Sequence, residues 1–343
     1  MGELIRIREV WKIFGESSHQ TIQEGCASKL EQLLLNTANR VAVRDVSLTI
    51  KQGEIFVVMG LSGSGKSTLL RMINGLINPT AGSVEIEGQA VQALPPSDLI
   101  ALRRQKMAMV FQSFALFPQR TALDNAAFGL EVAGMPKGQR QERARQALER
   151  VGLGNDLHRR PSQLSGGMQQ RVGLARALAL DPPILLMDEA FSALDPLIRR
   201  DMQDLLLDLQ NEQQRTVVFI SHDLDEAVRI GDRIALMQDG RLLQCGSAEE
   251  LLCHPNDPAV RQFFQEVDPS AVISVGAIAE QPAEGLVPDL QDQRKPILHA
   301  NTLLQEAIPV VAAATEPVPV ISEEQDFIGV VTANTLLRSL RTP

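Results

Sequence analysis

A glycine-rich loop in this chain has the residue types that bind phosphate. It reads Gly60-Leu-Ser-Gly-Ser-Gly-Lys-Ser67 and follows an apolar run, Ile55-Phe-Val-Val-Met59. A loop between a buried strand and a helix points backbone N–H groups at phosphate oxygens, and the helix N-terminus adds favourable potential. The pattern predicts Lys66 at the β- and γ-phosphates of ATP and the Ser67 hydroxyl at Mg²⁺. The predicted ATP-binding residues of this segment are Gly60, Ser62, Gly63, Ser64, Gly65, Lys66, Ser67 and Thr68.

An acidic pair follows a second apolar run, Ile184-Leu-Leu-Met187. Such a pair alone is usually a solvated strand end, but the apolar run before it and the phosphate loop elsewhere favour a chemical role. A carboxylate at the end of a buried strand can hold the Mg²⁺ shell, which is the role predicted for Asp188. Glu189 is then predicted to orient and polarise the attacking water.

A third segment, Leu164-Ser-Gly-Gly-Met-Gln-Gln170, precedes an expected helix through Arg171 and Arg176. Its amides and the Ser165 hydroxyl can form a second anion-binding helix terminus. Alone, the segment would be an ordinary helix cap. Together with the other two motifs it is interpreted as a lid that binds the γ-phosphate of ATP held by a second copy of the chain.

Composition limits the other possibilities. The chain has 343 residues, room for one large domain with an appendage or for two domains, and its formal net charge of −9 disfavours a general nucleic-acid surface. No apolar run approaches the roughly 20 residues that cross a bilayer, and the N-terminus lacks an apolar signal region. If the chain serves a membrane, another subunit must supply the spans. Three cysteines without paired spacing indicate reduced thiols, which suits the cytoplasm.

The pattern along the chain predicts an α/β fold. The two apolar runs and a third, Val217 to Ile220, alternate with helices, as in a parallel sheet. Residues 2–14 are expected to form a short strand and a turn, and Arg40 to Glu54 a hairpin around Lys51-Gln-Gly53. Residues from about 113 to 170 are expected to be an inserted helical subdomain. The segment 15–40 is expected to be an insertion with a short amphipathic helix.

The three motifs in this order resemble the nucleotide-binding subunit of an ATP-binding cassette (ABC) protein. The resemblance implies the P-loop NTPase fold, with a parallel core sheet, an antiparallel N-terminal β subdomain and a helical subdomain. It implies that Gln112 links the metal site to the helical subdomain and is a metal and catalytic residue, that Asp195 communicates between two copies, and that His222 contacts the γ-phosphate. The implied lid residues are Ser165, Gly166, Gly167 and Gln169.

Adenine stacking is expected at Phe14. Members of the family usually carry an aromatic residue, often tyrosine, near the N-terminus, and this chain has no tyrosine. Phe14, in Lys-Ile-Phe-Gly15, takes that position and presents the same π-face. Trp11 is a less favoured substitute, and core packing is the ordinary alternative for both residues.

Within the family the chain resembles the ATPases of glycine betaine/proline, or quaternary-amine, importers. The resemblance is carried by Met109-Val-Phe-Gln-Ser-Phe-Ala-Leu-Phe-Pro118, by Met187-Asp-Glu-Ala-Phe-Ser-Ala-Leu-Asp-Pro196 and by the insertion after Phe14. It implies a second copy, a transmembrane permease and, indirectly, an external or periplasmic substrate-binding protein as partners. It also implies a peripheral place on the cytoplasmic face of the cell membrane. Phe114, Leu116 and Phe117 are candidate permease contacts, with burial in the subunit as the alternative.

The tail is expected to be a separate small unit. The expected boundaries are an ATP-binding domain over 1–268, a linker over 269–293 and a regulatory unit over 294–343. The last unit is expected to contain a helix capped by Thr302, a strand through Val318 and Val320, a strand over Phe327 to Val331 and a final helix. This small α+β tail resembles one cystathionine-β-synthase-type (CBS) unit. Thr335 replaces the aspartate of that unit's ribose-binding pattern, which argues against nucleotide sensing there.

Several rival functions remain in view. DNA-maintenance ATPases with these motifs insert long coiled-coil arms between the loop and the lid, and only about a hundred residues separate Lys66 from Ser165 here. Translation factors of the superfamily carry two cassettes per chain, and P-loop kinases lack the lid motif. Another ABC importer, for amino acids or polyamines, is the serious alternative.

Overall fold

Strand β3, Ile55–Met59, consists only of buried residues and lies inside a six-stranded sheet. The computed structural model describes residues 2–15, 39–282 and 296–340. The strand order is β10-β9-β3-β8-β7-β6. The other strands are β6 (Met107–Phe111), β7 (Ile184–Asp188), β8 (Thr216–Ser221), β9 (Arg233–Gln238) and β10 (Arg241–Gly246).

The middle of this sheet is parallel. Strand β3 pairs in parallel with β8 and β9, and β7 pairs in parallel with β6 and β8. The register ends with Met59 opposite Ser221 and Asp188 opposite Ile220. The loops that follow these strands therefore leave the same edge of the sheet, which brings the predicted phosphate loop and the acidic pair together. The predicted parallel core sheet is confirmed.

Helices flank this sheet and begin at residues suited to capping. Helix α2 spans Lys66–Ile73 directly after the phosphate loop, and α9 spans Leu224–Ile230 with Asp223 as its N-cap. Helix α8, Pro196–Glu212, begins with proline in its first turn and is capped by the side chain of Asp195. The apolar stripe expected on α8 is present, with Met202, Leu206 and Leu209 buried and Leu205 half-buried.

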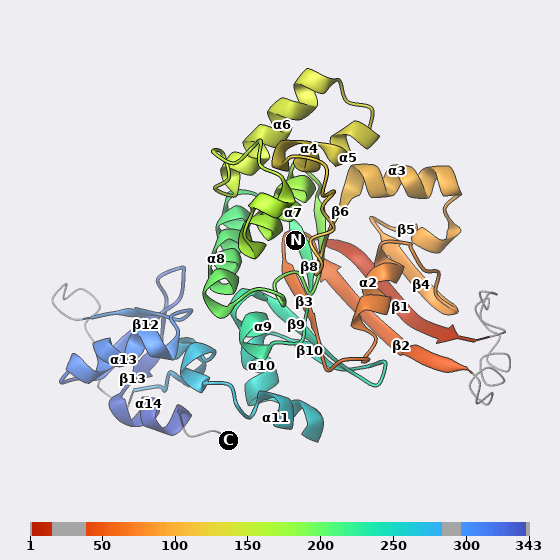
Figure 1. Cartoon of the computed structure of the whole chain (residues 1–343). Helices are drawn as coiled ribbons and strands as arrows, with labels where there is room; N and C mark the ends of the chain where they lie inside the picture. Colours follow the sequence, from red (N-terminus) through yellow and green to blue (C-terminus); the bar gives the residue numbers. More distant parts are fainter. Residues whose placement is uncertain (1, 16–38, 283–295, 341–343) are drawn as a thin grey trace. The chain divides into compact units, whose positions relative to one another are not determined.

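A helical subdomain is inserted between β6 and β7. It contains α4 (Ala122–Ala126), α5 (Phe128–Val132), α6 (Lys137–Arg150), a short 3₁₀ turn and α7 (Gly166–Leu178), and α4, α5 and α6 lie together beyond one end of the sheet in Figure 1. The fully buried side chain of Asn125 organises the loop before α4. It accepts the N–H of Phe117 at 2.8 Å and donates to the carbonyl of Thr121 at 2.9 Å.

A second, antiparallel sheet has the order β2-β1-β4-β5. Its strands are β1 (Glu3–Phe14), β2 (Arg40–Lys51), β4 (Ala81–Ile86) and β5 (Gln89–Ala90), and a helix α3, Pro96–Lys106, follows. The predicted antiparallel N-terminal subdomain is therefore present, but the hairpin predicted over Arg40 to Glu54 is wrong. Strand β2 pairs with β1, and the turn at Lys51 to Gly53 leads into the other sheet, because β3 is apolar on both faces and belongs in its interior.

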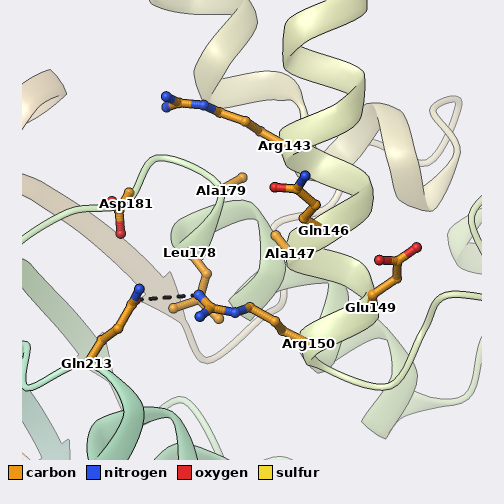
Figure 2. Close-up of a pocket in the computed structure, with 9 residues that line it drawn as sticks. All are labelled: Arg143, Gln146, Ala147, Glu149, Arg150, Leu178, Ala179, Asp181 and Gln213. Carbon is orange, nitrogen blue, oxygen red and sulfur yellow. Dashed lines mark hydrogen bonds between the residues drawn. The ribbon is translucent and has the colours of Figure 1, made fainter.

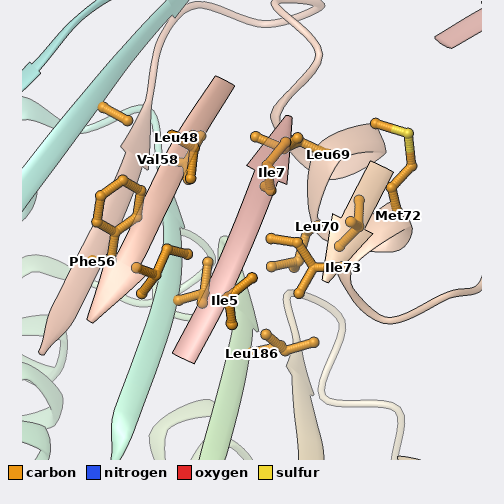
Figure 3. Close-up of a cluster of buried hydrophobic side chains, with 14 of the residues drawn as sticks. Ile5, Ile7, Leu48, Phe56, Val58, Leu69, Leu70, Met72, Ile73 and Leu186 are labelled. Atoms are coloured by element: carbon orange, nitrogen blue, oxygen red, sulfur yellow. The ribbon is translucent and has the colours of Figure 1, made fainter. Parts of the chain in front are cut away.

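The main core fills the space between the two sheets. Figure 3 shows side chains of β1 and β2 facing those of β3, α2 and β7, and all of them are buried. Leu69 and Leu70 anchor α2 in this cluster, opposite Ile5 and Ile7 of β1. Burial of these side chains fixes the helix that starts at the phosphate loop. The helix predicted in the 15–40 insertion lies outside the described residues.

The chain divides into two compact units, Met1–Cys245 and Gly246–Pro343, so the division falls before the expected boundary at 268. The second unit begins with α10 (Ala248–Cys253) and α11 (Pro258–Phe264), followed by a 3₁₀ turn and α12 (Val275–Ile278). The described part of the expected linker is therefore folded. Ser274 forms a β-bridge with Leu303, and Glu280 forms one with Val330.

The rest of the second unit follows the sequence prediction closely. It contains β11 (Leu298–His299), α13 (Leu304–Ala313), β12 (Val318–Ile321), β13 (Phe327–Val331) and α14 (Ala333–Ser339), with the strands in the order β11-β12-β13. The N-cap of α13 is Leu303 without a side-chain cap, so the predicted cap at Thr302 is wrong. Among the described residues, no helix is both long and apolar enough to span a membrane.

Candidate functional site

The phosphate loop is held in a shape that requires glycine. Gly65 has φ +100° and is the N-cap of α2, and a Cβ there would lie 2.3 Å from the carbonyl oxygen of Ala42. Gly60 has φ +149°, and its Cβ would lie 2.1 Å from the carbonyl oxygen of Met237. The backbone of β2 and the end of β9 thus enclose the loop, and only residues without a side chain fit at these two positions.

Lys66 is buried beneath the loop. Its ammonium donates to the carbonyl oxygens of Gly60 at 2.7 Å and Leu61 at 2.9 Å, and the residue is 5% exposed. Burial lowers the pKa of Lys66, while the nearby charges of Glu189 and Asp188 raise it. With these two hydrogen bonds, the loop backbone wraps around the ammonium group of Lys66. A nucleotide phosphate can replace the carbonyl oxygens as its partner, which suits the predicted role.

A pocket of about 420 Å³ lies over the loop. It is lined by the predicted residues Phe14, Ser62, Gly63, Gly65, Lys66, Ser67, Thr68 and Glu189, together with Arg40, Ala42 and Arg71. Phe14 is 39% exposed, and the Lys12 ammonium lies 5.2 Å from the centroid of its ring. An exposed aromatic face at a pocket of this size suits base stacking. The predicted ATP-binding residues Gly60 and Ser64 are buried and do not line this pocket.

Sequence reasoning missed three of these lining residues. Arg40 is the cross-strand partner of Phe14, a pairing that the mistaken hairpin concealed. Ala42 lies two residues further along the same strand. Arg71 lies one helical turn after Ser67 on α2, so the helical spacing could have identified it.

Two of the three side chains expected to hold Mg²⁺, Ser67 and Asp188, lie together. The Ser67 hydroxyl donates to Oδ1 of Asp188 at 2.9 Å. Burial raises the pKa of Asp188, and the hydrogen bond from Ser67 and the charge of Arg71 oppose that shift. A partly buried carboxylate beside a hydroxyl is a hard-oxygen environment that a divalent cation would stabilise, so these residues fit the ion.

Gln112 lies one residue after β6, whose last residue, Phe111, is opposite Asp188. The Gln112 side chain donates to the Ser192 hydroxyl at 3.0 Å, and that hydroxyl donates to the carbonyl oxygen of Glu189 at 2.9 Å. Gln112 is therefore connected to the acidic pair through Ser192. The structure gives it no direct bond to Ser67 or Asp188.

Glu189 and His222 meet above the sheet edge. Nδ1 of His222 lies 3.2 Å from Oε2 of Glu189. Glu189 has φ +46°, and its N–H donates to the carbonyl oxygen of Ile220 at 3.1 Å, so the turn after β7 is fastened to the end of β8. A carboxylate and an imidazole in contact beside a phosphate site can orient a water and a phosphate oxygen.

The lid residues lie at the start of α7. Ser165 is the N-cap, where its hydroxyl accepts the N–H of Met168 at 3.3 Å, and Gly166 follows it, also exposed. Gly167 packs against α8, where a Cβ would lie 2.5 Å from Cγ2 of Ile198. The Gln169 side chain donates to the carbonyl oxygen of Leu164 at 3.2 Å. None of these residues lines the pocket of their own chain, and neither does Asp195, which accepts the N–H of Ile198 at 3.1 Å.

Another pocket, of about 710 Å³, lies between α6, the end of α7 and Gln213 (Figure 2). Arg150 donates to the Gln213 side chain at 3.4 Å across it. Its lining includes Arg143, Glu149 and Asp181 but none of the predicted site residues. Its size alone therefore does not make it the reaction site, since the chemical groups converge on the smaller pocket.

Comparison with known proteins decides the family. Residues 43–192 match the ABC transporter family model. The chain is 45% identical to the glycine betaine/proline betaine transport system ATP-binding protein of Escherichia coli, over 99% of this chain and 98% of that protein. The chain belongs to the ATP-binding subunits of ABC transporters. It is also 50% identical to the glycine betaine/carnitine transport ATP-binding protein of Listeria monocytogenes, over 81% of this chain and 70% of that protein.

The fold comparison agrees. A dimeric post-hydrolysis ATP-binding cassette bound to ADP and Pi is similar with a TM-score of 0.61 and 35% identity, over 71% of this chain and 98% of that one. The predicted ABC-type P-loop fold is confirmed, and the chain is an ATP-hydrolysing transport protein within the glycine betaine ATP-binding protein family. The resemblance of the tail to a CBS unit stays a prediction.

Proposed function

We propose that this ABC subunit hydrolyses ATP to drive import of a compatible solute, with glycine betaine and related quaternary amines as the first candidates. The observation that carries the proposal is the pocket of about 420 Å³, in which the phosphate loop and Glu189 face one another. The similarity to glycine betaine transport proteins extends over nearly the whole chain. An importer for another amine or amino acid is the alternative.

The predicted site residues in and around the pocket take separate roles in this proposal. The loop amides and Lys66 bind the phosphates, and Phe14 stacks on the base. Ser67 and Asp188, with Gln112 nearby, would hold Mg²⁺, which would neutralise charge developing on the phosphate oxygens. Glu189 orients and polarises the attacking water. His222 keeps the Glu189 carboxylate in place, and His222 also faces the γ-phosphate.

A second copy of the chain completes the site. Ser165 and Gly166 are exposed at a helix N-terminus and lie outside their own pocket, so they are free to cover ATP bound by a partner. Closure of the pair follows ATP binding, and loss of the γ-phosphate after hydrolysis allows reopening, because ATP binds the closed pair better than the open one. Asp195, at the start of α8, is placed on the same dimer face in this proposal.

The permease contacts the loop after β6. Residues 112–118 carry the apolar side chains proposed to face it, and Phe117 is 37% exposed. The permease lies in the membrane, so the chain works at the cytoplasmic face as a peripheral subunit. An external substrate-binding protein would deliver the solute and would never touch this chain.

The proposed solute is chosen by comparing how much of this chain each class of relative matches. Methionine import ATP-binding proteins also match, for example at 45% identity from Caulobacter vibrioides, but over 68% of this chain. The glycine betaine protein of Bacillus subtilis matches over 98% of this chain and 92% of that protein, so its similarity includes the second unit. We propose that residues 294–343, within this second unit, form a CBS-like regulatory part.

Uptake measurements in a strain that lacks the chain test this proposal. We expect the strain to lose uptake of radiolabelled glycine betaine at high osmolarity and to keep methionine uptake. The wild-type gene should restore betaine uptake, and the Glu189→Gln gene should not. If the strain instead kept betaine uptake and lost methionine uptake, and the wild-type gene restored the methionine uptake, the chain would belong with the alternative importers.

A further inference from the structure

The contact between Glu189 and His222 depends on two separate loops. Glu189 begins the loop after β7, and His222 lies in the loop after β8. The ladder between these strands ends at Asp188 and Ile220. Beyond it, one backbone bond, from the N–H of Glu189 to the carbonyl oxygen of Ile220, joins them. Side-chain contacts beyond this backbone bond also connect the two loops.

Arg199 on α8 bridges the two loops. Its Nη1 donates to Oδ2 of Asp223 at 2.8 Å, next to His222. Its Nη2 donates to the carbonyl oxygens of Ser192 at 3.3 Å and Leu194 at 3.2 Å, in the loop after Glu189. One rigid guanidinium therefore binds acceptors on both sides.

The acceptors that Arg199 binds are connected to Glu189 on one side and to His222 on the other. Ser192 is bonded to the carbonyl oxygen of Glu189 through both its hydroxyl, at 2.9 Å, and its N–H, at 3.2 Å. Asp223 directly follows His222, and its other oxygen, Oδ1, accepts the N–H of Glu226 at 3.2 Å to cap α9. The bridge thus acts on loops whose positions are already tied to Glu189 and His222.

A second contact lies one helical turn along α8. Gln203 donates to Oε1 of Glu226 at 3.2 Å, and Oε2 of Glu226 accepts the hydroxyl of Ser221 at 2.6 Å. Helix α8 therefore holds the loop that carries His222 at two points, Asp223 and Glu226. A displacement of α8 would carry this loop with it.

We propose that Arg199 is a positioning residue that sets the separation of Glu189 and His222. Asp195 is the N-cap of the same helix, α8. Through Asp195 and α8, the position of the second copy also affects this separation. This inference rests on the proposed roles of Glu189, His222 and Asp195. Arginine suits the task because its planar fork binds several acceptors at fixed angles, whereas a lysine ammonium is a flexible point charge. Arg199 does not line the ATP pocket, and we therefore expect its substitution to affect kcat more than the affinity for ATP.

Two substitutions remove the bridge from opposite sides. Arg199→Lys keeps the charge and loses the fork. Asp223→Asn keeps an oxygen for capping α9 and loses the ion pair with Arg199. The matched control is Arg200→Lys, at the exposed neighbouring residue on the same helix. ATPase rates of the purified full-length chains, measured over a range of ATP concentrations, separate kcat from KM.

We expect kcat to fall about 10-fold to 100-fold in both bridge variants, with KM for ATP unchanged and the control like the wild type. The double variant should be no slower than the slower single variant, because both substitutions break the same bridge between the two loops. Melting temperatures matching the control would show that the fold is retained. Wild-type kcat in Arg199→Lys, or losses that multiply in the double variant, would overturn the proposal. Glu189→Gln in the same assay separates this outcome from failure of the site, since full activity in that variant would contradict the proposed function itself.

Discussion

Nδ1 of His222 lies 3.2 Å from Oε2 of Glu189, and the two side chains come from loops after adjacent parallel strands. The sheet therefore brings together residues that are far apart in the sequence. Glu189 also lines the pocket above the phosphate loop. In the proposed function the carboxylate takes part in the chemical step and the imidazole orients it, and this contact supports that division.

Replacing the carboxylate by its isosteric amide tests this division. Glu189→Gln keeps the shape and can still contact His222, but the amide cannot polarise a water. We expect ATP binding to persist and kcat to fall about 100-fold to 10,000-fold, as for loss of a general base. Nucleotide binding measured by equilibrium titration and phosphate release in a single turnover check the two parts separately. Turnover within a few-fold of the wild type would remove Glu189 from this role.

The two loop glycines Gly63 and Gly65 should respond differently to alanine. Both have positive φ, +82° and +100°, so each alanine costs about 1–2 kcal/mol in backbone strain. At Gly63 nothing lies within 4 Å of the added Cβ, whereas at Gly65 the carbonyl oxygen of Ala42 lies at 2.3 Å. Urea unfolding without nucleotide should show a clearly larger loss of stability for Gly65→Ala. Equal losses would mean that β2 does not confine the loop as described.

The buried carboxyl of Glu226 should make stability depend on pH. Burial raises the pKa of Glu226, and hydrogen bonds from Ser221 and Gln203 oppose the shift. Because the folded protein binds this proton more tightly than the unfolded chain, the stability that Glu226 contributes is lost as pH rises from the unfolded pKa, about 4.3, through the folded pKa. The amide in Glu226→Gln does not titrate, so the melting temperature of this variant minus that of the wild type should increase over this interval. A constant difference would contradict the shift.

Arg176 should connect α7 to the proposed permease loop. Its guanidinium donates to the carbonyl oxygens of Phe114 at 3.1 Å and Ala115 at 2.5 Å. Both acceptor residues have positive φ, 48° and 47°, a conformation that costs about 1–3 kcal/mol each and persists only where surrounding contacts hold it. We expect Arg176→Met to keep the ATPase activity of the isolated chain and to lose solute uptake by the assembled transporter. Arg143→Met, at an exposed arginine of α6, is the control, and normal uptake with Arg176→Met would refute the connection.

The residues nearest to the chemistry could be predicted because their signals are local. The phosphate loop, the acidic pair and the lid each combine a short motif with one adjoining element, and the structure places each on that element. The apolar runs also identified the buried strands, since β3 and β8 contain no exposed residue. Short motifs beside a strand or helix with a clear hydrophobic pattern can be recognised in the sequence, because that one element determines their geometry.

Long-range pairing was the part that could not be predicted. Strand β2 turns away from β3 to pair with β1, and this pairing brings Arg40 beside Phe14. In the expected linker, single bridges from Ser274 to Leu303 and from Glu280 to Val330 order a segment with little local pattern. The gain from such pairing depends on residues far away in the sequence, which a local pattern does not contain.

In the proposed function, two copies of this chain share each ATP site. Mixing Lys66→Ala chains with Ser165→Arg chains tests it directly, because the first lacks the phosphate lysine and the second lacks a working lid. In a mixed pair, one site has both defects and the other has none, so we predict that two inactive preparations regain up to half of the wild-type ATPase rate per mixed pair. Activity of either variant alone, or no recovery on mixing when the mixed pair demonstrably forms, would contradict a site built from two copies.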